Sequence, residues 1–340
     1  MRSFTPGKFG ISARITSPRD PVMVVVRATA AIAGTVAIAL QPAAALSAAR
    51  ATLGPFVTLA AIIGGSVLAN RLGAFRLAAR LLVPGRAPRT AAAAAVLAFT
   101  ALLSALANLD VAVVVAVPVA MRAANGHRLP AGRLAVAVAV TANAASFLLP
   151  TSNVTSLLLL ARARLPALDY LRDSWLAWLL VVAITIGALA GWLTRAGNVG
   201  TRPARTGLAG PSARAAIDLV PMFLIASAIR AILADGLTLR GDIAAQLAIG
   251  SAIAAAVSNL PAAAALHPAG APGLWAAVLA TAIGPNLIIT GSVATVICRR
   301  ITRDAGATFQ AWQFSAAGAA LLPAQFAVAM LGLHITGALR

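Results

Sequence analysis

The chain alternates between long apolar stretches and short segments that carry most of its arginines. A transmembrane helix needs about 20 consecutive, mostly apolar residues to cross the roughly 30 Å hydrocarbon core of a bilayer. Stretches of about that length or longer lie at 22–46, 52–72, 90–121, 134–161, 174–194, 216–234, 243–266, 273–298 and 310–337. This pattern predicts an all-α polytopic membrane protein.

Three parts of this pattern are too long for one simple span each. Thr90–Met121 has 32 residues and a single charge, Asp110; as one straight helix it would be about 48 Å long. Leu134–Ala161 carries no charge, and Ile243–Cys298 contains no Asp, Lys or Arg. We therefore predict re-entrant hairpins at 90–121 and 243–266, and broken transmembrane helices at 134–161 and 273–298.

The arginines between the stretches favour one orientation, because basic loops tend to stay in the cytoplasm. If the N-terminus is cytoplasmic and each hairpin returns to the side it enters, every strongly basic loop faces the cytoplasm. These loops hold Arg76, Arg80, Arg86, Arg89, Arg122, Arg128, Arg133, Arg195, Arg202, Arg205, Arg214, Arg299, Arg300 and Arg303. The loop at 162–173, where Asp169 and Asp173 offset three arginines, then lies outside.

The two halves of the chain carry matching polar motifs in the same order. Ala-Asn-Leu-Asp at 107–110 corresponds to Ser-Asn-Leu-Pro at 258–261, and the segment 150–156 corresponds to 289–295. The charge pattern gives the halves opposite orientations, and inverted repeats with broken helices are a transporter architecture. The predicted divisions are an N-terminal cytoplasmic segment with the first span (1–49), repeat 1 (50–194), a cytoplasmic linker (195–215) and inverted repeat 2 (216–340).

Composition excludes several other classes of protein. Hydrophobic residues make up 60% of the chain and charged residues 10%, whereas soluble domains carry about 25% charged residues. The net charge of +19 does not indicate nucleic-acid binding, because the arginines are dispersed and not clustered with aromatic residues. Residues 28–40 also resemble the apolar part of a signal peptide, and an uncleaved first span is the alternative. Both place the N-terminus in the cytoplasm, and we expect the plasma membrane of a bacterium.

Small polar residues at membrane depth are the candidate functional site. Non-helical backbone survives in a bilayer only where protein or water satisfies it, so the polar clusters indicate helix breaks around a cavity. Helix N-termini there suit anions or oxygen atoms, and Asn and Ser groups suit Na⁺ or a neutral polyhydroxyl solute. The alternative is that these residues only pack helices together. The candidate binding residues are Asn108, Asp110, Ser152, Asn153, Thr155, Ser258, Asn259, Gly291, Ser292 and Thr295.

Asp110 is the one carboxylate deep within an apolar stretch. An acidic residue inside a membrane is costly and is a functional candidate by default. It can titrate for proton coupling or bind a cation, and the alternative is that it caps a helix N-terminus.

The remaining chemistry does not point to an enzyme. The chain has three scattered histidines and one cysteine, Cys298, so we expect no metal site and no disulfide. It has no phosphate-binding Gly-x-x-x-x-Gly-Lys loop, and no mid-span histidine that could activate a serine nucleophile. We expect no cofactor.

Four segments carry a resemblance to a known family. They are LSALANLDVAVVVAVPVAM at 103–121, TANAASFLLPTSNVTSLLLL at 141–160, VSNLPAAAAL at 257–266 and AIGPNLIITGSVATVI at 282–297. In this order they resemble the hairpins and broken helices of ArsB-type arsenite permeases and NhaD-like antiporters of the ion transporter superfamily. The likeness covers about 50–340. The chain departs from the family in its short linker and at Asn286, where a charged residue can occur.

The resemblance implies export of arsenite or antimonite, driven by proton entry through Asp110. It implies that Asn108, Asn153, Asn259 and Ser292 bind the solute or set the hairpin tips. Rival functions are Na⁺/H⁺ antiport, Na⁺-coupled uptake of a dicarboxylate-type anion, and a non-transporting membrane scaffold or partner subunit. The expected partners are the lipid bilayer and a small inorganic solute or ion, with no nucleic acid. A homodimer and an ATPase subunit both stay open.

Overall fold

The computed structural model describes residues 21–82, 87–195, 220–221, 224–225, 227–229, 231–232 and 237–340. These residues are almost entirely helical and contain no β-strand. The prediction of an all-α protein is confirmed to that extent. Residues 1–20, nearly all of the predicted linker and much of the predicted span at 216–234 lie outside the described residues.

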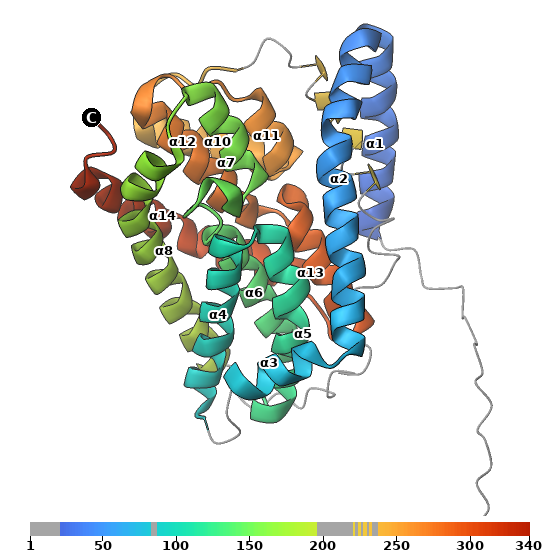
Figure 1. Cartoon of the computed structure of the whole chain (residues 1–340), viewed down its shortest axis with the longest axis vertical. Coiled ribbons are helices and arrows are strands. Elements are labelled where there is room, and N and C mark those ends of the chain that lie inside the picture. The colour runs from blue at the N-terminus through green and yellow to red at the C-terminus, as the bar shows by residue number, and fades with distance from the viewer. Residues whose placement is uncertain are drawn as a thin grey trace, which may run out of the picture.

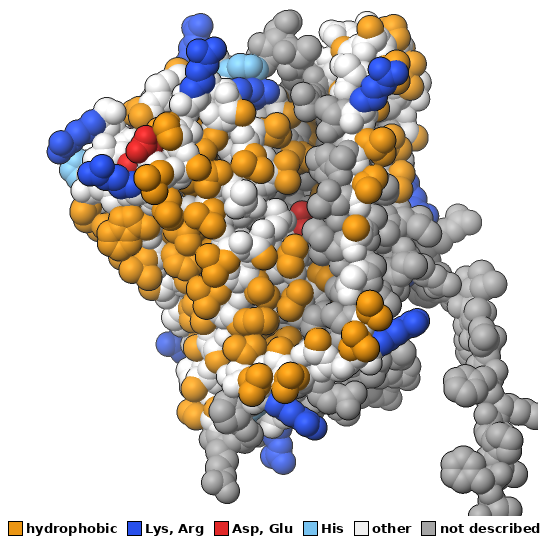
Figure 2. Space-filling model, viewed as in Figure 1, with side chains coloured by type: hydrophobic (Ala, Val, Ile, Leu, Met, Phe, Trp, Pro, Cys, Tyr) orange, Lys and Arg blue, Asp and Glu red, His pale blue; other side chains and the backbone are white. Residues whose placement is uncertain are grey.

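Four of the described helices are long and apolar enough to cross a membrane. They are α4 (Arg89–Leu106), α5 (Leu109–His127), α8 (Ala167–Arg195) and α14 (Ala311–Thr336). On the face shown in Figure 2, hydrophobic side chains cover the middle of the molecule, and Lys and Arg side chains lie mainly toward its two ends. This distribution is typical of a membrane protein, with an apolar belt between two charged rims.

Two long helices and one short helix precede α4. Helix α1 (Pro21–Leu40) and helix α2 (Pro42–Arg71) lie side by side at one edge of the bundle, and α3 (Ala74–Leu82) lies across its lower end (Figure 1). The boundary between the first two helices falls at Gln41, earlier than the predicted gap at 47–51. The physical reason is Pro42, because proline fits the first turn of a helix and has no N–H to donate.

The later helices follow the same order twice. The first series is α4, α5, α6 (Ala131–Ala144), the 3₁₀ turn η1 (Pro150–Ser152), α7 (Val154–Ala163) and α8. The second series is α10 (Ile243–Val257), α11 (Asn259–Ala265), α12 (Gly270–Ile283), the 3₁₀ turns η2 (Gly284–Leu287) and η3 (Ile289–Gly291), α13 (Val293–Asp304) and α14. Both predicted hairpins are helix–turn–helix units, and both predicted broken helices are interrupted.

The two interrupted helices have closely similar backbones. Helices α6 and α12 each have 14 residues. Helix α6 leads through one 3₁₀ turn, and α12 through two, into a further helix. The residue before that helix is extended in both, with φ of −150° at Asn153 and −142° at Ser292. In Figure 1, α4, α5 and α6 lie in the lower half of the bundle and α7, α10, α11 and α12 in the upper half. The interruptions therefore meet near the middle.

Candidate site at the helix interruptions

The first interruption, between α6 and α7, frees backbone carbonyls inside the bundle. Side chains of the neighbouring helices α4 and α8 donate hydrogen bonds to these carbonyls. Such bonds allow an irregular segment to lie at membrane depth. The bonds are Ser104 Oγ to Ala142 O (2.7 Å), Trp178 Nε1 to Ala145 O (2.9 Å), Tyr170 OH to Phe147 O (2.9 Å) and Ser174 Oγ to Leu148 O (2.9 Å). This interruption is therefore held in one shape by hydrogen bonds from two packed helices.

Asn153 forms the N-cap of α7. Its Oδ1 accepts a hydrogen bond from the Thr155 backbone N–H at 3.1 Å, and its Nδ2 donates to Ser146 Oγ at 3.1 Å. Ser152 Oγ donates to the carbonyl of Ala105 at 2.5 Å and joins the interruption to the end of α4. The predicted residues Ser152, Asn153 and Thr155 thus lie together, and two of them have structural hydrogen bonds.

The first hairpin tip lies against this interruption. Asn108 caps α5, because its Oδ1 accepts from the Asp110 backbone N–H at 2.8 Å, and its Nδ2 lies 3.4 Å from the carbonyl oxygen of Thr151. Asp110 is half-buried in the first turn of α5. No described cation pairs with its carboxylate, and the N-capping side chain is Asn108. The alternative that Asp110 is itself the cap is therefore wrong.

The second hairpin turns differently. Ser258 has a φ of +77°, in the left-handed region that favours glycine. Asn259 begins α11, and its Oδ1 accepts from the Leu260 backbone N–H at 2.9 Å. Both predicted residues are buried, and their hydrogen bonds stay within the tip.

The two interruptions are joined by a bridge of buried amides. Asn143, in the last turn of α6, donates from Nδ2 to Asn286 Oδ1 at 2.9 Å and to Thr295 Oγ1 at 3.1 Å. Asn286 in η2 donates from its own Nδ2 to the carbonyl of Val140 at 3.3 Å. Asn143, Asn286 and Thr295 are fully buried. We call these three residues the amide bridge.

Among the described residues, five buried polar atoms of the two interrupted helices have no hydrogen-bond partner. They are Thr141 Oγ1, Asn143 Oδ1, Thr155 Oγ1, Ser156 Oγ and Ser292 Oγ. A buried polar group without a partner costs about 1–3 kcal/mol, so such atoms are normally satisfied by protein, water or a ligand. Thr155 lies in the first turn of α7, and Ser292 is the residue before α13. Unpaired hydroxyls therefore stand at the N-terminal ends of both continuing half-helices.

The second interruption is packed by small residues. Gly318 of α14 lies against the backbone of Asn286, and a Cβ added there would stand 2.6 Å from its carbonyl carbon. Gly284 similarly faces Ser251 of α10, and a Cβ at Gly291 would lie 2.8 Å from the Pro285 carbonyl oxygen. Gly291, predicted as a binding residue, has a packing role in the structure. Close approach of small residues therefore positions this interruption, together with the hydrogen bonds of the amide bridge.

The structure thus divides the predicted site residues into two groups. The first group makes structural bonds or contacts and consists of Asn108, Ser152, Asn153, Ser258, Asn259 and Gly291. The second group lies at the half-helix ends or in the amide bridge and consists of Thr155, Ser292 and Thr295. Asp110, in the first turn of α5, belongs to neither group. Sequence reasoning did not select Thr141, Asn143 or Asn286 as binding residues. The available signal was that Thr141 and Asn143 are polar residues within an uncharged apolar stretch, and that Asn286 lies three residues before the polar run at 289–295.

A guanidinium group fixes the second hairpin to α7. Arg162 donates to the carbonyls of Ala263 (2.9 Å), Ala264 (2.6 Å) and Leu266 (2.6 Å) at the end of α11. A positive group is well placed at the C-terminal end of a helix, where the last carbonyls have no partner within the helix. This contact holds the outer end of the hairpin against the first half of the chain.

Replacing Arg162 with Gln is expected to lower the free energy of unfolding by about 1.5–3 kcal/mol, because charged hydrogen bonds to buried carbonyls are lost. Arg164→Gln is the matched control, since Arg164 is exposed two residues further along. Thermal unfolding of the two purified variants in detergent measures the difference. Equal unfolding midpoints for the two variants would show that Arg162 contributes no more to stability than a surface arginine does.

A cavity of about 320 Å³ lies elsewhere, between α8 and α14 beside the start of α6. None of the predicted site residues lines it.

Comparisons with protein-family models, with curated proteins and with solved structures found no match for the chain.

Proposed function

We propose that the chain is a secondary active transporter, with its solute site where the two interrupted helices meet. The observation that carries this proposal is the group of buried, unpaired hydroxyl and amide oxygens at the start of α7, before α13 and in α6. Unpaired polar atoms inside a membrane protein indicate a solute or ion pathway more readily than they indicate helix packing.

The repeated helix order supports the same proposal. If the two series are an inverted repeat, the interrupted helices α6–α7 and α12–α13 cross the membrane in opposite directions and meet at the midplane. Discontinuous helices of this kind form the substrate sites of many secondary transporters. The plasma membrane of a bacterium, with the N-terminus in the cytoplasm, is the proposed setting.

The chemistry of the site suits a small solute rich in oxygen. The unpaired atoms belong to hydroxyls and an amide, and the half-helix N-termini offer backbone N–H groups. Among the described residues no group of three His, Cys, Asp or Glu side chains is placed to hold a metal ion. Arsenous acid, a neutral trihydroxy solute near pH 7, both donates and accepts hydrogen bonds. We propose arsenite or antimonite as the solute, and the sequence resemblance supports the same choice.

The difference between the interruptions suggests which part moves. The first is fixed by four side-chain hydrogen bonds from α4 and α8, and the second is packed by glycines. Alternating access requires one unit to slide or rock against the other. In this proposal α10–α12, together with α7 to which Arg162 fixes them, move against α4–α6 (Figure 1). The bond between Asn143 and Asn286 in the amide bridge breaks and re-forms with each cycle.

Ser292→Ala tests the solute site directly. We expect transport to fall at least tenfold, because the hydroxyl before α13 would no longer reach the solute. Stability should stay within about 0.5 kcal/mol of wild type or rise, since the removed group is buried and unpaired. Transport and thermal unfolding are measured on the same preparation.

The matched control is Thr281→Val on α12. Its buried hydroxyl is already bonded to the carbonyl of Ala277 at 2.8 Å within its own helix, so transport should be retained. Ser292→Ala with full transport would remove Ser292 from the solute site and favour a purely structural role for these hydroxyls.

Asp110→Asn tests proton coupling. We expect solute flux through this variant to lose its dependence on an imposed pH gradient, because the amide cannot carry a proton. The helix cap should be unaffected, since the capping side chain is Asn108. Flux measured in vesicles over a series of pH gradients gives the answer. An unchanged pH dependence would exclude Asp110 as the proton carrier.

Growth assays separate the proposal from its rivals. Expression of an arsenite exporter should raise tolerance to arsenite and leave tolerance to Na⁺ unchanged. A change in Na⁺ tolerance alone would favour Na⁺/H⁺ antiport, and no change in either would favour a different substrate or a non-transporting scaffold.

A further inference from the structure

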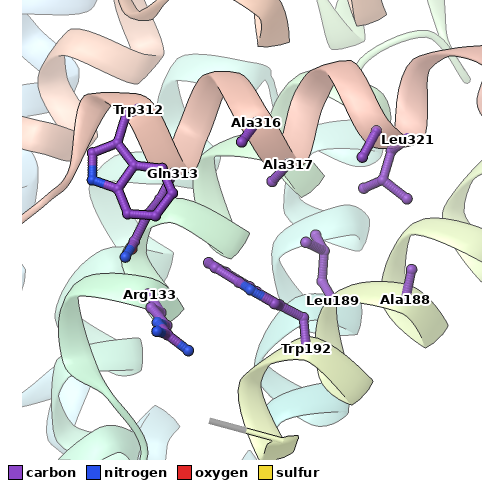
Figure 3. Close-up of a pocket in the computed structure, with 10 residues that line it drawn as sticks. Arg133, Ala188, Leu189, Trp192, Trp312, Gln313, Ala316, Ala317 and Leu321 are labelled. Atoms are coloured by element: carbon purple, nitrogen blue, oxygen red, sulfur yellow. The ribbon is translucent and has the colours of Figure 1, made fainter.

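The cavity between α8 and α14 has one polar end and one apolar end (Figure 3). Arg133 from the first turn of α6 and Gln313 from the first turn of α14 lie at one end. Ala188 of α8 and Ala316 and Leu321 of α14 lie toward the other. A volume of about 320 Å³ is within the range of small-molecule sites. This shape fits a molecule with a polar head and an apolar chain.

The polar end carries the positive charge of Arg133. No carboxylate among the described residues pairs with Arg133, whose guanidinium carbon stands 5.4 Å from the centroid of the Trp192 ring. The side-chain oxygen of Gln313 is buried and has no hydrogen-bond partner. The Arg133 guanidinium and the Gln313 side-chain amide line the same end of the groove (Figure 3), and together they suit an anion that also carries a hydrogen-bonding group.

The position of the cavity matches the headgroup level of a bilayer. It lies where α6 and α14 begin and α8 ends, at the lower end of the bundle (Figure 1). Trp192 and Trp312 line its mouth, and the Trp312 side chain is 66% exposed. Tryptophan is enriched where hydrocarbon meets water, and basic pockets between transmembrane helices bind anionic lipid headgroups.

We propose that this groove binds one anionic phospholipid of the surrounding bilayer, of the phosphatidylglycerol type. Arg133 holds the phosphate, and a headgroup hydroxyl forms a hydrogen bond with the side-chain amide of Gln313. One acyl chain lies along the alanines of α8 and α14. The lipid would join the ends of α6, α8 and α14, and this site is independent of the proposed solute site.

The test compares lipid retention by the purified full chain. The protein is delipidated in detergent, supplied with phosphatidylglycerol or phosphatidylcholine, and bound lipid is counted by native mass spectrometry. Wild type should retain phosphatidylglycerol preferentially and unfold at a higher temperature with it. Arg133→Gln should lower that retention about fivefold, while Arg133→Lys and the exposed Arg195→Gln retain it.

A second pair of variants tests the chain-binding end without changing charge. Ala316→Phe should block the groove and reduce retention of phosphatidylglycerol, whereas Ala319→Phe, exposed on the same helix and outside the groove, should not. Equal retention of the two lipids by wild type would overturn the proposal, as would unchanged retention in both Arg133→Gln and Ala316→Phe. Stabilisation by soluble glycerol phosphate alone would identify a free anion as the occupant of the groove. Dimers cross-linked at position 316 would identify a second copy of the chain as the occupant.

Discussion

Replacing Asn143 with alanine is expected to abolish transport and to destabilise the protein strongly. The change leaves Asn286 Oδ1 and Thr295 Oγ1 without their donor in a fully buried site. Each buried acceptor that loses its partner costs about 1–3 kcal/mol. The substitution also removes the only described side-chain hydrogen bonds from α6 to the second interruption. Chemical or thermal unfolding in detergent gives the stability, and vesicle flux gives the activity.

Gln310→Ala provides the control for this experiment. Gln310 is an exposed amide before α14 and accepts a hydrogen bond from Trp312, so its loss should change stability by less than about 0.5 kcal/mol. A double-mutant cycle of Asn143→Ala with Thr295→Ala isolates the bond between the two halves. A coupling energy near zero would mean that the amide bridge does not hold the halves together.

The second large effect is expected at Gly318. A Cβ on this residue would overlap the carbonyl group of Asn286, so Gly318→Ala must push α14 away from η2. Overpacking of this kind costs about 1–3 kcal/mol, and it displaces the amide bridge. We expect a lower unfolding temperature together with a large loss of transport.

Gly191→Ala is the matched control, because nothing lies within 4 Å of a Cβ added at that position of α8. Alanine is favoured over glycine inside a helix by about 0.5–1 kcal/mol, so this variant should be at least as stable as wild type. The two substitutions are chemically identical, but Gly318→Ala should lower the free energy of unfolding and Gly191→Ala should leave it unchanged or raise it. Similar stability changes would show that α14 can shift at no cost.

The main outline of the fold could be predicted from the sequence because apolar length and polar interruptions act locally. The excess length of 90–121 predicted a hairpin, and the structure turns between α4 and α5 at Ala107 and Asn108. Asn108 produces that turn by capping the helix that follows. The interruptions before Val154 and Val293 follow equally from their polar runs.

The partners of the polar residues could not be predicted, because they depend on contacts between distant segments. Asn143 and Asn286 are 143 residues apart, and no periodicity in either segment indicates that they meet. Arg162 was assigned to an outer loop by the charge pattern, yet it is bonded to carbonyls of α11. Ser104 and Tyr170 were indistinguishable from other polar residues within apolar helices until the carbonyls they satisfy could be seen.

Solute flux in proteoliposomes tests the central proposal most directly. Purified protein is reconstituted, and arsenite uptake is followed with the vesicle interior made acidic relative to the medium. If the chain exchanges arsenite for protons, arsenite should accumulate on the acidic side, above the level in empty vesicles, and Ser292→Ala should reduce that difference at least tenfold. Uptake equal to that of empty vesicles, or accumulation driven by a Na⁺ gradient alone, would contradict the proposal.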